Sequence, residues 1–269
     1  MSALLIPTLI LIATGAGAGI LAGLLGVGGG IILVPAFLYA FTHAGYGGPD
    51  VMQICLATSL ATIIVTSIRS VMAHDRRGAV DWTILRNWAP WIAIGALLGV
   101  LTVGALRTHT LQIIFAVLVV LIASFMAISR PHWRLGETMP TGIRRALIGP
   151  VIGFVSVLVG IGGGSMGVPL MTLHGRPMHK AVATSAGFGV LIAVPSVAGF
   201  LLVPAAGAPP YTLGSVNIPA LLITIAMTLI TAPIGAALAH RTDPVRLKRI
   251  FAIFLFLVAI NMMRKALMG

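Results

Sequence analysis

Long apolar runs, separated by short polar segments, fill most of the sequence. A helix crosses the ~30 Å hydrocarbon core of a membrane with about 20 residues. Continuous apolar runs without two-residue alternation favour helices over strands. The runs therefore predict membrane-spanning helices in a multi-pass protein. Seven runs are long enough to cross, near 4–25, 51–73, 84–106, 109–129, 180–203, 217–240 and 246–266, and a shorter run lies at 146–159.

Two further apolar stretches, about 31–42 and 165–173, are too short to cross the membrane as straight helices. Each follows a cluster of three consecutive glycines, at 28–30 and at 162–164. A glycine inside a helix costs about 1 kcal/mol relative to alanine, so three in succession predict a break. We expect each stretch to form a half-helix that starts after its glycine cluster.

The composition agrees with a membrane protein. Hydrophobic residues make up 58% of the 269 residues and charged residues 8%, against about 25% charged in soluble domains. A chain of this length cannot bury so many apolar side chains in its own core. An ordinary soluble enzyme is therefore excluded, and we expect a membrane protein. Cys55 is the single cysteine, which excludes an internal disulfide and a CxxC site; no cofactor is expected.

Basic residues outnumber acidic residues by 17 to 5, which gives a net charge of +12. On a soluble protein this balance indicates nucleic acid, but here the basic residues lie between apolar runs, so no nucleic-acid partner is expected. Cytoplasmic connections retain positive charge. Fourteen of the seventeen Lys and Arg residues fit one side, and only Arg107, Arg264 and Lys265 fall opposite. Both termini are therefore predicted outside the cytoplasm.

The sequence contains an internal repeat. The segment from Gly26 to Pro35 recurs from Gly160 to Pro169, with the same four glycines and the same final Val-Pro. The triplet Ala-Thr-Ser follows each copy, at 57–59 and at 183–185. The two halves are therefore duplicates. Further along, Gly99 with Phe115 matches Gly235 with Phe251 at one spacing.

The halves differ in the charge of corresponding connections. Arg76 and Arg77 follow the span of the first triplet, whereas the counterpart connection at 204–216 contains no Lys or Arg. Opposite orientations of the halves follow, as in inverted-repeat transporters. Inversion requires an odd number of crossings, which predicts an all-α polytopic fold of two inverted repeats with about five helical segments each. The alternative is a parallel arrangement of four plus four crossings. The predicted division is a first transmembrane repeat at 1–129, a cytoplasmic linker at 130–145 and a second transmembrane repeat at 146–269.

The glycine breaks suit the binding of an anion. A helix that restarts after a break presents free backbone N–H groups and the positive end of its dipole. Non-helical backbone at membrane depth survives only inside protein or along a wet cavity. No carboxylate is available at the membrane centre to hold a cation or relay protons, because the acidic residues all lie in connections or at their edges: Asp50, Asp75, Asp81, Glu137 and Asp243. A small-anion site at the midplane is therefore predicted.

The candidate substrate-binding residues are the glycines of the breaks, nearby hydroxyl side chains and the proline of each Val-Pro: Gly28, Gly29, Gly30, Pro35, Thr58, Ser59, Gly162, Gly163, Gly164, Ser165, Pro169, Thr184 and Ser185. The structural alternative is that the glycines allow close helix packing and the hydroxyls bond to their own helices. Each Val-Pro removes one helix N–H and predicts a kink in the short helix or its end. The breaks are not chemically equivalent, because Ile31 and Leu33 stand where the second copy has Ser165 and Gly167.

The duplicated G-x-G-G-G-x-x-x-V-P, each copy followed by A-T-S in the next span, resembles the TauE/SafE family of sulfite exporters. This family is also called the 4-toluene sulfonate uptake permease family, and the similarity extends over nearly the whole chain. The resemblance implies a multi-pass carrier of the plasma (bacterial inner) membrane that moves sulfite or a small organosulfur anion of the sulfonate type. Coupling to an ion gradient is one option. The partners of such a carrier would be the small anionic substrate, a coupling ion and the lipid bilayer.

The function predicted is secondary transport of a small anion by alternating access around a midplane site, and not enzyme catalysis. Two alternatives stand beside it. One is an uncoupled anion channel with the same site. The other is an intramembrane hydrolase, because Gly163 to Gly167 also satisfies the G-x-S-x-G of hydrolases. That motif requires an acid and then a histidine, and no histidine follows Asp243. The seven histidines lack a pattern of metal ligands, so no metal site is predicted.

Overall fold

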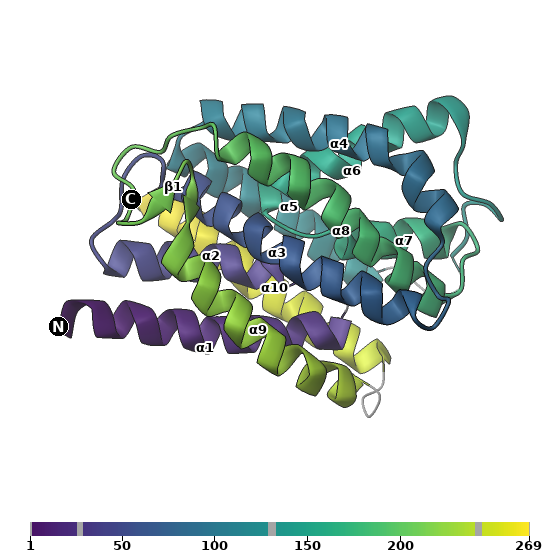
Figure 1. The fold of residues 1–269 in the computed structure, drawn as a ribbon, viewed down its shortest axis with the longest axis horizontal. Coiled ribbons are helices and arrows are strands. Elements are labelled where there is room, and N and C mark those ends of the chain that lie inside the picture. The colour runs from purple at the N-terminus through teal and green to yellow at the C-terminus, as the bar shows by residue number, and fades with distance from the viewer. Residues whose placement is uncertain (1, 26–28, 129–132, 240–243, 269) are drawn as a thin grey trace.

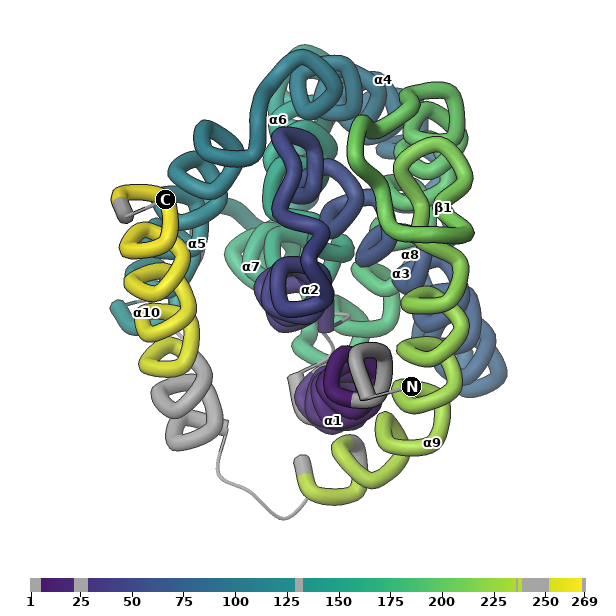
Figure 2. The backbone as a smooth tube through the Cα atoms, turned by 90° about the vertical axis from the view of Figure 1, so that its left-hand side faces the viewer, coloured from purple at the N-terminus to yellow at the C-terminus, as the bar shows by residue number. Residues whose placement is uncertain are grey.

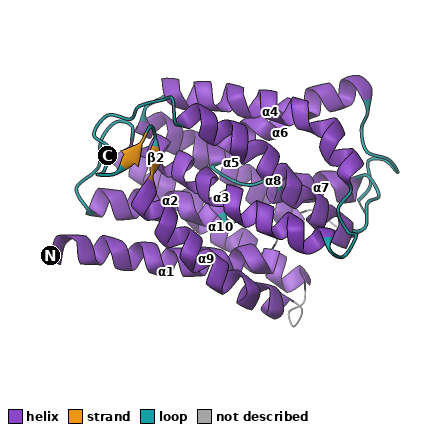
Figure 3. Cartoon of the chain, viewed as in Figure 1, coloured by secondary structure: helices purple, strands orange, loops and turns teal. Residues whose placement is uncertain are grey.

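In the computed structural model the chain is almost entirely helical (Figure 1, Figure 3). The structure describes residues 2–25, 29–128, 133–239 and 244–268. Within them the first five helices are α1 (Ser2–Leu25), α2 (Gly30–His43), α3 (Val51–Asp75), α4 (Trp82–Ala105) and α5 (Thr108–Ile128). The second five are α6 (Gly142–Val159), α7 (Gly164–Leu173), α8 (Met178–Phe200), α9 (Ile218–Ala239) and α10 (Pro244–Met268). The all-α fold predicted from the apolar runs is confirmed.

A short hairpin is the exception to the helical fold in the described residues. Strands β1 (Thr212–Leu213) and β2 (Val216–Asn217) pair antiparallel between α8 and α9. The hairpin folds back over the end of α8, where the Ser215 amide donates to the Phe200 carbonyl at 2.9 Å and the Ser215 hydroxyl donates to the Val203 carbonyl at 2.7 Å. The sequence analysis did not predict it.

Both glycine clusters break the chain where the sequence predicts. In the first half, α2 begins directly after Gly29, whose φ of 69° lies in the left-handed region that glycine adopts without strain. In the second half, α6 ends at Gly160, which has a φ of 63° and forms a left-handed C-cap. The half-helices expected after the breaks are α2 and α7. Of the candidate residues, Gly28 lies outside the described residues.

The two Val-Pro pairs do not end their helices. Pro35 and Pro169 are both the sixth residue of their helix, and α2 continues to His43 and α7 to Leu173. Of the two outcomes expected for each Val-Pro, a kink or a helix end, the helix end is therefore wrong. A proline removes one backbone hydrogen bond, and both helices continue past it.

The helices have the lengths and surfaces that a bilayer requires. Six of the described helices are long and apolar enough to cross a membrane: α3, α4, α5, α6, α8 and α9. Of these, α3 and α8 are the most buried inside the protein. The outer helices expose large aliphatic side chains, including Leu101, Leu121, Leu147, Leu222 and Ile253, which lipid tails would cover. The chain is thus a multi-pass membrane protein.

Most of the large helix contacts join a helix of one half to a helix of the other half. Helix α1 packs against α9, and its counterpart α6 packs against α4, the counterpart of α9. In the same way α3 contacts α9 while α8 contacts α4, and α3–α8 and α5–α10 pair each helix with its own counterpart. Figure 2 shows α1 beside α9, α4 beside α6 and α5 beside α10 around the outside, with α2 and α7 between them.

The central helices α3 and α8 run antiparallel. Asp50, just before α3, accepts a hydrogen bond at Oδ2 from the amide of Ala206, which follows α8 (2.9 Å). At the other end Asp81, after α3, contacts Arg176, just before α8. In Figure 1, α1 and α6 also run in opposite directions. These orientations are consistent with an inverted repeat of five segments per half.

Glycines allow the closest helix crossings. A Cβ on Gly153 of α6 would collide with the carbonyl oxygen of Ile92 in α4, and one on Gly95 would collide with that of Pro150. The corresponding crossing of α1 and α9 has Gly19 against the hydroxyl of Thr231 and Gly235 against the carbonyl of Ile20. Small residues at these crossings let the helix backbones touch.

Candidate functional site

The second glycine break leaves backbone donors free inside the protein. The amide of Ile161 turns back to the carbonyl of Ser156 (2.9 Å), and α7 then begins at Gly164. The Gly167 amide donates to the Gly163 carbonyl (2.6 Å). The preceding amides, those of Gly164, Ser165 and Met166, donate to no acceptor that the structure describes. Gly164 and Ser165 are both buried. The first turn of α7 therefore presents unsatisfied N–H groups and the positive end of a helix dipole.

Ser59 joins the two breaks. Its hydroxyl donates to the Gly160 carbonyl at 2.8 Å and lies 3.5 Å from the Gly30 carbonyl. Gly30 itself packs so closely that a Cβ would collide with the Gly160 carbonyl oxygen. The serine of the first triplet thus fixes the start of α2 against the end of α6, and all three residues are buried.

The second triplet's serine lies on the other side of the second break. A Cβ on Gly167 would lie 2.7 Å from Ser185 Cβ, and one on Gly163 would collide with Phe188 of the same helix, α8. The Ser185 hydroxyl donates to the Val182 carbonyl in its own helix (3.1 Å). The start of α7 therefore packs directly on the middle of α8.

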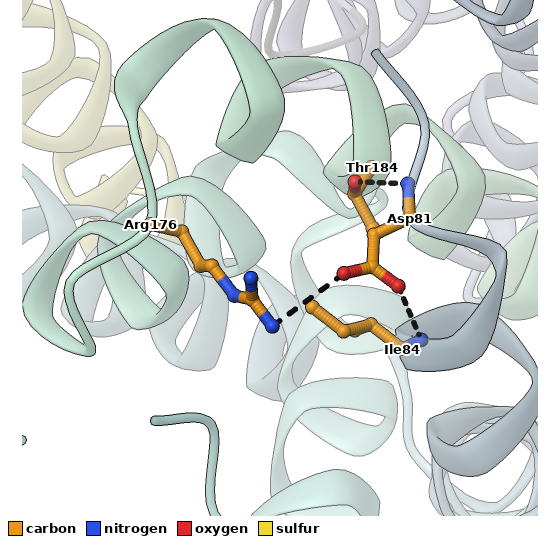
Figure 4. A network of polar contacts seen from close by, with 4 residues as sticks. All are labelled: Asp81, Ile84, Arg176 and Thr184. Carbon is orange, nitrogen blue, oxygen red and sulfur yellow. Dashed lines mark hydrogen bonds and ion pairs between the residues drawn. The ribbon is translucent and has the colours of Figure 1, made fainter. Parts of the chain in front are cut away.

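Thr184 of the second triplet holds the start of α4. Its hydroxyl accepts a hydrogen bond from the backbone amide of Asp81 (3.0 Å), as Figure 4 shows. Asp81 is the N-cap of α4, and its Oδ1 accepts from the amide of Ile84 (3.1 Å). Its Oδ2 lies 3.5 Å from Nη2 of Arg176. Thr184 is thus attached to a helix of the first half.

Thr58 makes the corresponding contact in the opposite direction. Its hydroxyl accepts from the backbone amide of Asn217 (3.0 Å), directly before α9. Asn217 caps α9 through Oδ1, which accepts from the amide of Ala220 (3.0 Å). The Asn217 side-chain amide donates to Pro210 and Thr212 at the hairpin. Both triplet threonines therefore anchor a helix of the other half.

The structure thus separates the candidate residues into groups. Gly30, Ser59 and the end of α6 meet at one place, and Gly163, Gly164, Ser165 and Ser185 meet at the start of α7. Thr58 and Thr184 lie at the helix caps described above. Pro35 and Pro169 are half-buried within α2 and α7. The remaining described candidates, Gly29 and Gly162, are buried in the breaks themselves.

The sequence did not lead us to predict two features of the site, namely the two N-cap residues and Ser67. Asp81 and Asn217 precede Gly99 and Gly235 by the same distance, and both are of the type preferred at helix N-caps. This signal was available in the repeat. Ser67 of α3 lies beside Gly189 of α8, and no sequence signal indicates that contact, because it depends on how α3 packs on α8. Among the described residues, no group of three or more His, Cys, Asp or Glu side chains is placed to hold a metal ion.

Comparison with known proteins identifies the family. The family model described as "Sulfite exporter TauE/SafE" matches residues 11–262. The chain belongs to the TauE/SafE family of membrane transporters. Both glycine motifs lie within the matched range, so the TauE/SafE match covers both breaks and both triplets. No solved structure shows significant similarity to the chain.

Curated relatives agree with the TauE/SafE assignment. A "Probable membrane transporter protein" of Haemophilus influenzae is 34% identical over 259 residues, which covers 96% of this chain and 98% of the relative. A protein of the same description from Methanocaldococcus jannaschii is 28% identical over 252 residues, covering 91% of this chain and 90% of the relative. The chain is accordingly a membrane transporter rather than an enzyme.

Proposed function

We propose that this TauE/SafE protein is a secondary transporter of a small anion, sulfite or an organosulfur anion of the sulfonate type. The family description names sulfite, and a sulfonate presents the same three-oxygen face. The anion binds within the membrane at the glycine breaks. The two halves rock against each other and expose that site to each side in turn.

The observation that carries the proposal is the buried start of α7. Free amides of its first turn gather where the helix dipole is positive, and that combination favours a negative ligand. The Ser165 hydroxyl lies beside them and donates to the Gly162 carbonyl at 3.3 Å. The acidic side chains that the structure describes lie in the connections or at the helix ends: Asp50, Asp75, Asp81 and Glu137. A cation therefore has no carboxylate to bind at this depth, whereas an oxyanion finds hydrogen-bond donors.

Contacts at both ends of the protein support alternating access. Arg176 and Asp81 join the α7–α8 and α3–α4 connections at one end. At the other end the Asp50 carboxylate and the Ala206 amide join the α2–α3 and α8–α9 connections, which correspond to the first pair in the repeat. The glycines and Ser165 between the two ends are buried. Opening one contact while the other stays closed would expose the site to one side only.

The first test is ligand-induced stabilisation of the detergent-purified protein. Sulfite, methanesulfonate, thiosulfate, taurine, sulfate and chloride are added in parallel, and the midpoint of thermal unfolding is measured. A ligand at a hundred times its Kd adds about 2.7 kcal/mol to the stability of the folded state. A selective rise with sulfite or one sulfur-containing anion supports the proposal. The absence of a rise with any anion, for protein whose folding circular dichroism confirms, contradicts it.

The second test separates a carrier from the alternative mechanisms. Protein in liposomes loaded with unlabelled sulfite is mixed with external labelled sulfite. Counterflow that saturates with concentration indicates alternating access, whereas flux that rises linearly and shows no counterflow indicates a channel. The Ser165→Ala variant should lose most of the sulfite flux. Hydrolysis of ester substrates by the wild-type protein would instead indicate the hydrolase.

A further inference from the structure

The two glycine breaks differ in the side chains around them, although their backbones follow one motif. In the first half the break is lined by large aliphatic side chains: Ile31 and Leu33 are buried in α2, and Cδ1 of Ile63 in α3 lies 3.0 Å from where a Cβ of Gly30 would be. The second half has smaller residues at the corresponding positions, namely Ser165, Gly167 and Gly189. The second break therefore carries smaller and more polar side chains at these positions than the first, while Phe188 of α8 packs on the start of α7.

Ser67 of α3 occupies the space that Gly189 leaves beside the second break. A Cβ at residue 189 would collide with Ser67 Oγ and would lie 3.5 Å from the backbone nitrogen of Gly163. The Ser67 hydroxyl and the backbone nitrogen of Gly163 therefore both lie within 3.5 Å of the same point. Residue 193 corresponds to Ser67 in the other half and is an alanine, so the first break has no equivalent hydroxyl.

The Ser67 hydroxyl lacks a partner within the described part of the protein. The residue is 6% exposed, and its hydroxyl forms no hydrogen bond with any residue that the structure describes. Neighbouring Thr66, by contrast, bonds back to the Thr62 carbonyl of its own helix (3.3 Å). The Ser67 Oγ is not one of the fully buried atoms without a partner, so it keeps some accessible surface and can donate to a ligand.

A second unpaired hydroxyl lies in the turn that leads into the same break. Ser156, in the last turn of α6, is fully buried, and its Oγ has no hydrogen-bond partner among the described residues. Its counterpart in the repeat is Ala22, a residue type without a hydroxyl. Over the ranges that the structure describes, unpaired donors thus accumulate at the second break: the Ser67 and Ser156 hydroxyls and the amides of Gly164, Ser165 and Met166.

We infer that the transported anion binds at the second break alone, with Ser67 as a direct donor from the opposite half, while the first break serves a structural role. This inference rests on the proposed function. Oxygens of the anion accept from the α7 amides and from the Ser67 hydroxyl. The Ser165 hydroxyl turns towards them from the Gly162 carbonyl, to which it donates at 3.3 Å in this structure. All these donors are neutral, and burial of a second uncompensated charge is costly. The site therefore selects a monoanion, such as hydrogen sulfite or a sulfonate, over the sulfate dianion.

Binding to matched variants tests this inference. The variants are Ser67→Ala, which removes the unpaired hydroxyl, and Ser196→Ala, whose hydroxyl bonds only to the Ile192 carbonyl of its own helix (2.6 Å). The dissociation constants for sulfite and methanesulfonate are measured by titration of the unfolding midpoint, with sulfate as the dianion control. We expect Ser67→Ala to raise both constants about tenfold, Ser196→Ala to leave them within about twofold, and sulfate to bind neither variant nor the wild type. Ser67→Cys, which retains the volume but donates weakly, provides a second measurement if the alanine variant does not fold.

The outcomes separate this inference from the proposed function. Wild-type binding that Ser67→Ala and Ser67→Cys leave unchanged overturns the role of Ser67 while anion transport stands. Sulfate binding as tight as that of methanesulfonate overturns the selection of a monoanion. If the wild type binds none of these anions, the proposed function fails and the inference fails with it.

Discussion

The hydroxyl of Thr58 accepts a hydrogen bond from the backbone amide of Asn217, 159 residues later in the chain, at 3.0 Å. The repeat produces the matching bond between Thr184 and Asp81, also at 3.0 Å. In both, a helix of one half holds the N-cap residue of a helix in the other half. The repeated triplet therefore has a structural role at its threonine, which is distinct from the contacts made by its serine.

Loss of either threonine hydroxyl should destabilise the fold. Thr58→Val keeps the side-chain shape but leaves the buried Asn217 amide without an acceptor, which costs about 1–3 kcal/mol. Thr184→Val should have a similar effect, because the Asp81 amide is left without its acceptor. The midpoint of thermal unfolding in detergent measures both. Thr66→Val is the control, because Thr66 bonds only within its own helix. An equally large loss of stability in Thr66→Val would contradict the structural role of the bonds that Thr58 and Thr184 accept.

The N-cap hydrogen bond of Asp81 should contribute more to the stability of the fold than its ion pair with Arg176. Asp81→Asn retains an oxygen to cap Ile84 and loses the charge that faces Arg176. The two side chains are 27% and 40% exposed, so the screened pair contributes about 0–1 kcal/mol. Asp81→Ala also removes the cap and should cost about 1 kcal/mol more. Thermal unfolding of the two variants separates the contribution of the ion pair from that of the N-cap. Equal losses of stability in the two variants would show that the cap contributes nothing.

Two glycines of α1 should respond in opposite ways to alanine. A Cβ on Gly19 would collide with Thr231 and lie 2.8 Å from Cα of Thr228 in α9, whereas nothing lies within 4 Å of a Cβ on Gly17. Gly19→Ala should therefore separate α1 from α9 and lower the unfolding midpoint by several degrees. Gly17→Ala should raise stability by about 0.5–1 kcal/mol, because alanine is the better helix former. Equal responses would place the α1–α9 contact in doubt.

The orientation of the halves can be measured by thiol labelling. In a Cys55→Ser background, single cysteines replace Gly47, Leu213, Thr138 or His179, which are all exposed. We expect an impermeant reagent applied to intact cells to label positions 47 and 213, and to label 138 and 179 only after permeabilisation. Labelling of positions 47 and 179 from the same side would favour the parallel arrangement of four plus four crossings.

Most of the fold follows from the sequence, because most helices coincide with the apolar runs. The run at 51–73 becomes α3 at Val51–Asp75, and the stretch at 165–173 becomes α7 at Gly164–Leu173. Three glycines in succession give a break whatever surrounds them. The β1–β2 hairpin was not foreseen, because its two-residue strands are held by contacts with the end of α8 rather than by a pattern of their own.

The candidate site was predictable only in part. The motif located the breaks, since glycine has few other reasons to occur three times in succession inside an apolar run. It did not separate the threonines, which accept from the N-cap residues of distant helices, from the serines, which lie at the breaks. That distinction depends on which helices of the two halves become neighbours. The same dependence kept Ser67 out of the predicted set, because its significance comes from the missing side chain at Gly189 in another helix.

The exchange of contacts between the halves also sets an order for biosynthesis. Helix α1 leaves the ribosome before the other described helices, but its main partner in the finished protein is α9, which begins only at Ile218. The amide of Asp81, the N-cap residue of α4, likewise cannot bond to Thr184 until that residue, 103 positions downstream, has been synthesised. The first half therefore enters the membrane before the helices that cover its inner faces have been made. The insertion machinery or lipid must cover those faces until the second half is inserted. Synthesised as two separate chains, the halves would each lack the surfaces that complete them, and they would acquire their native packing only by meeting in the bilayer.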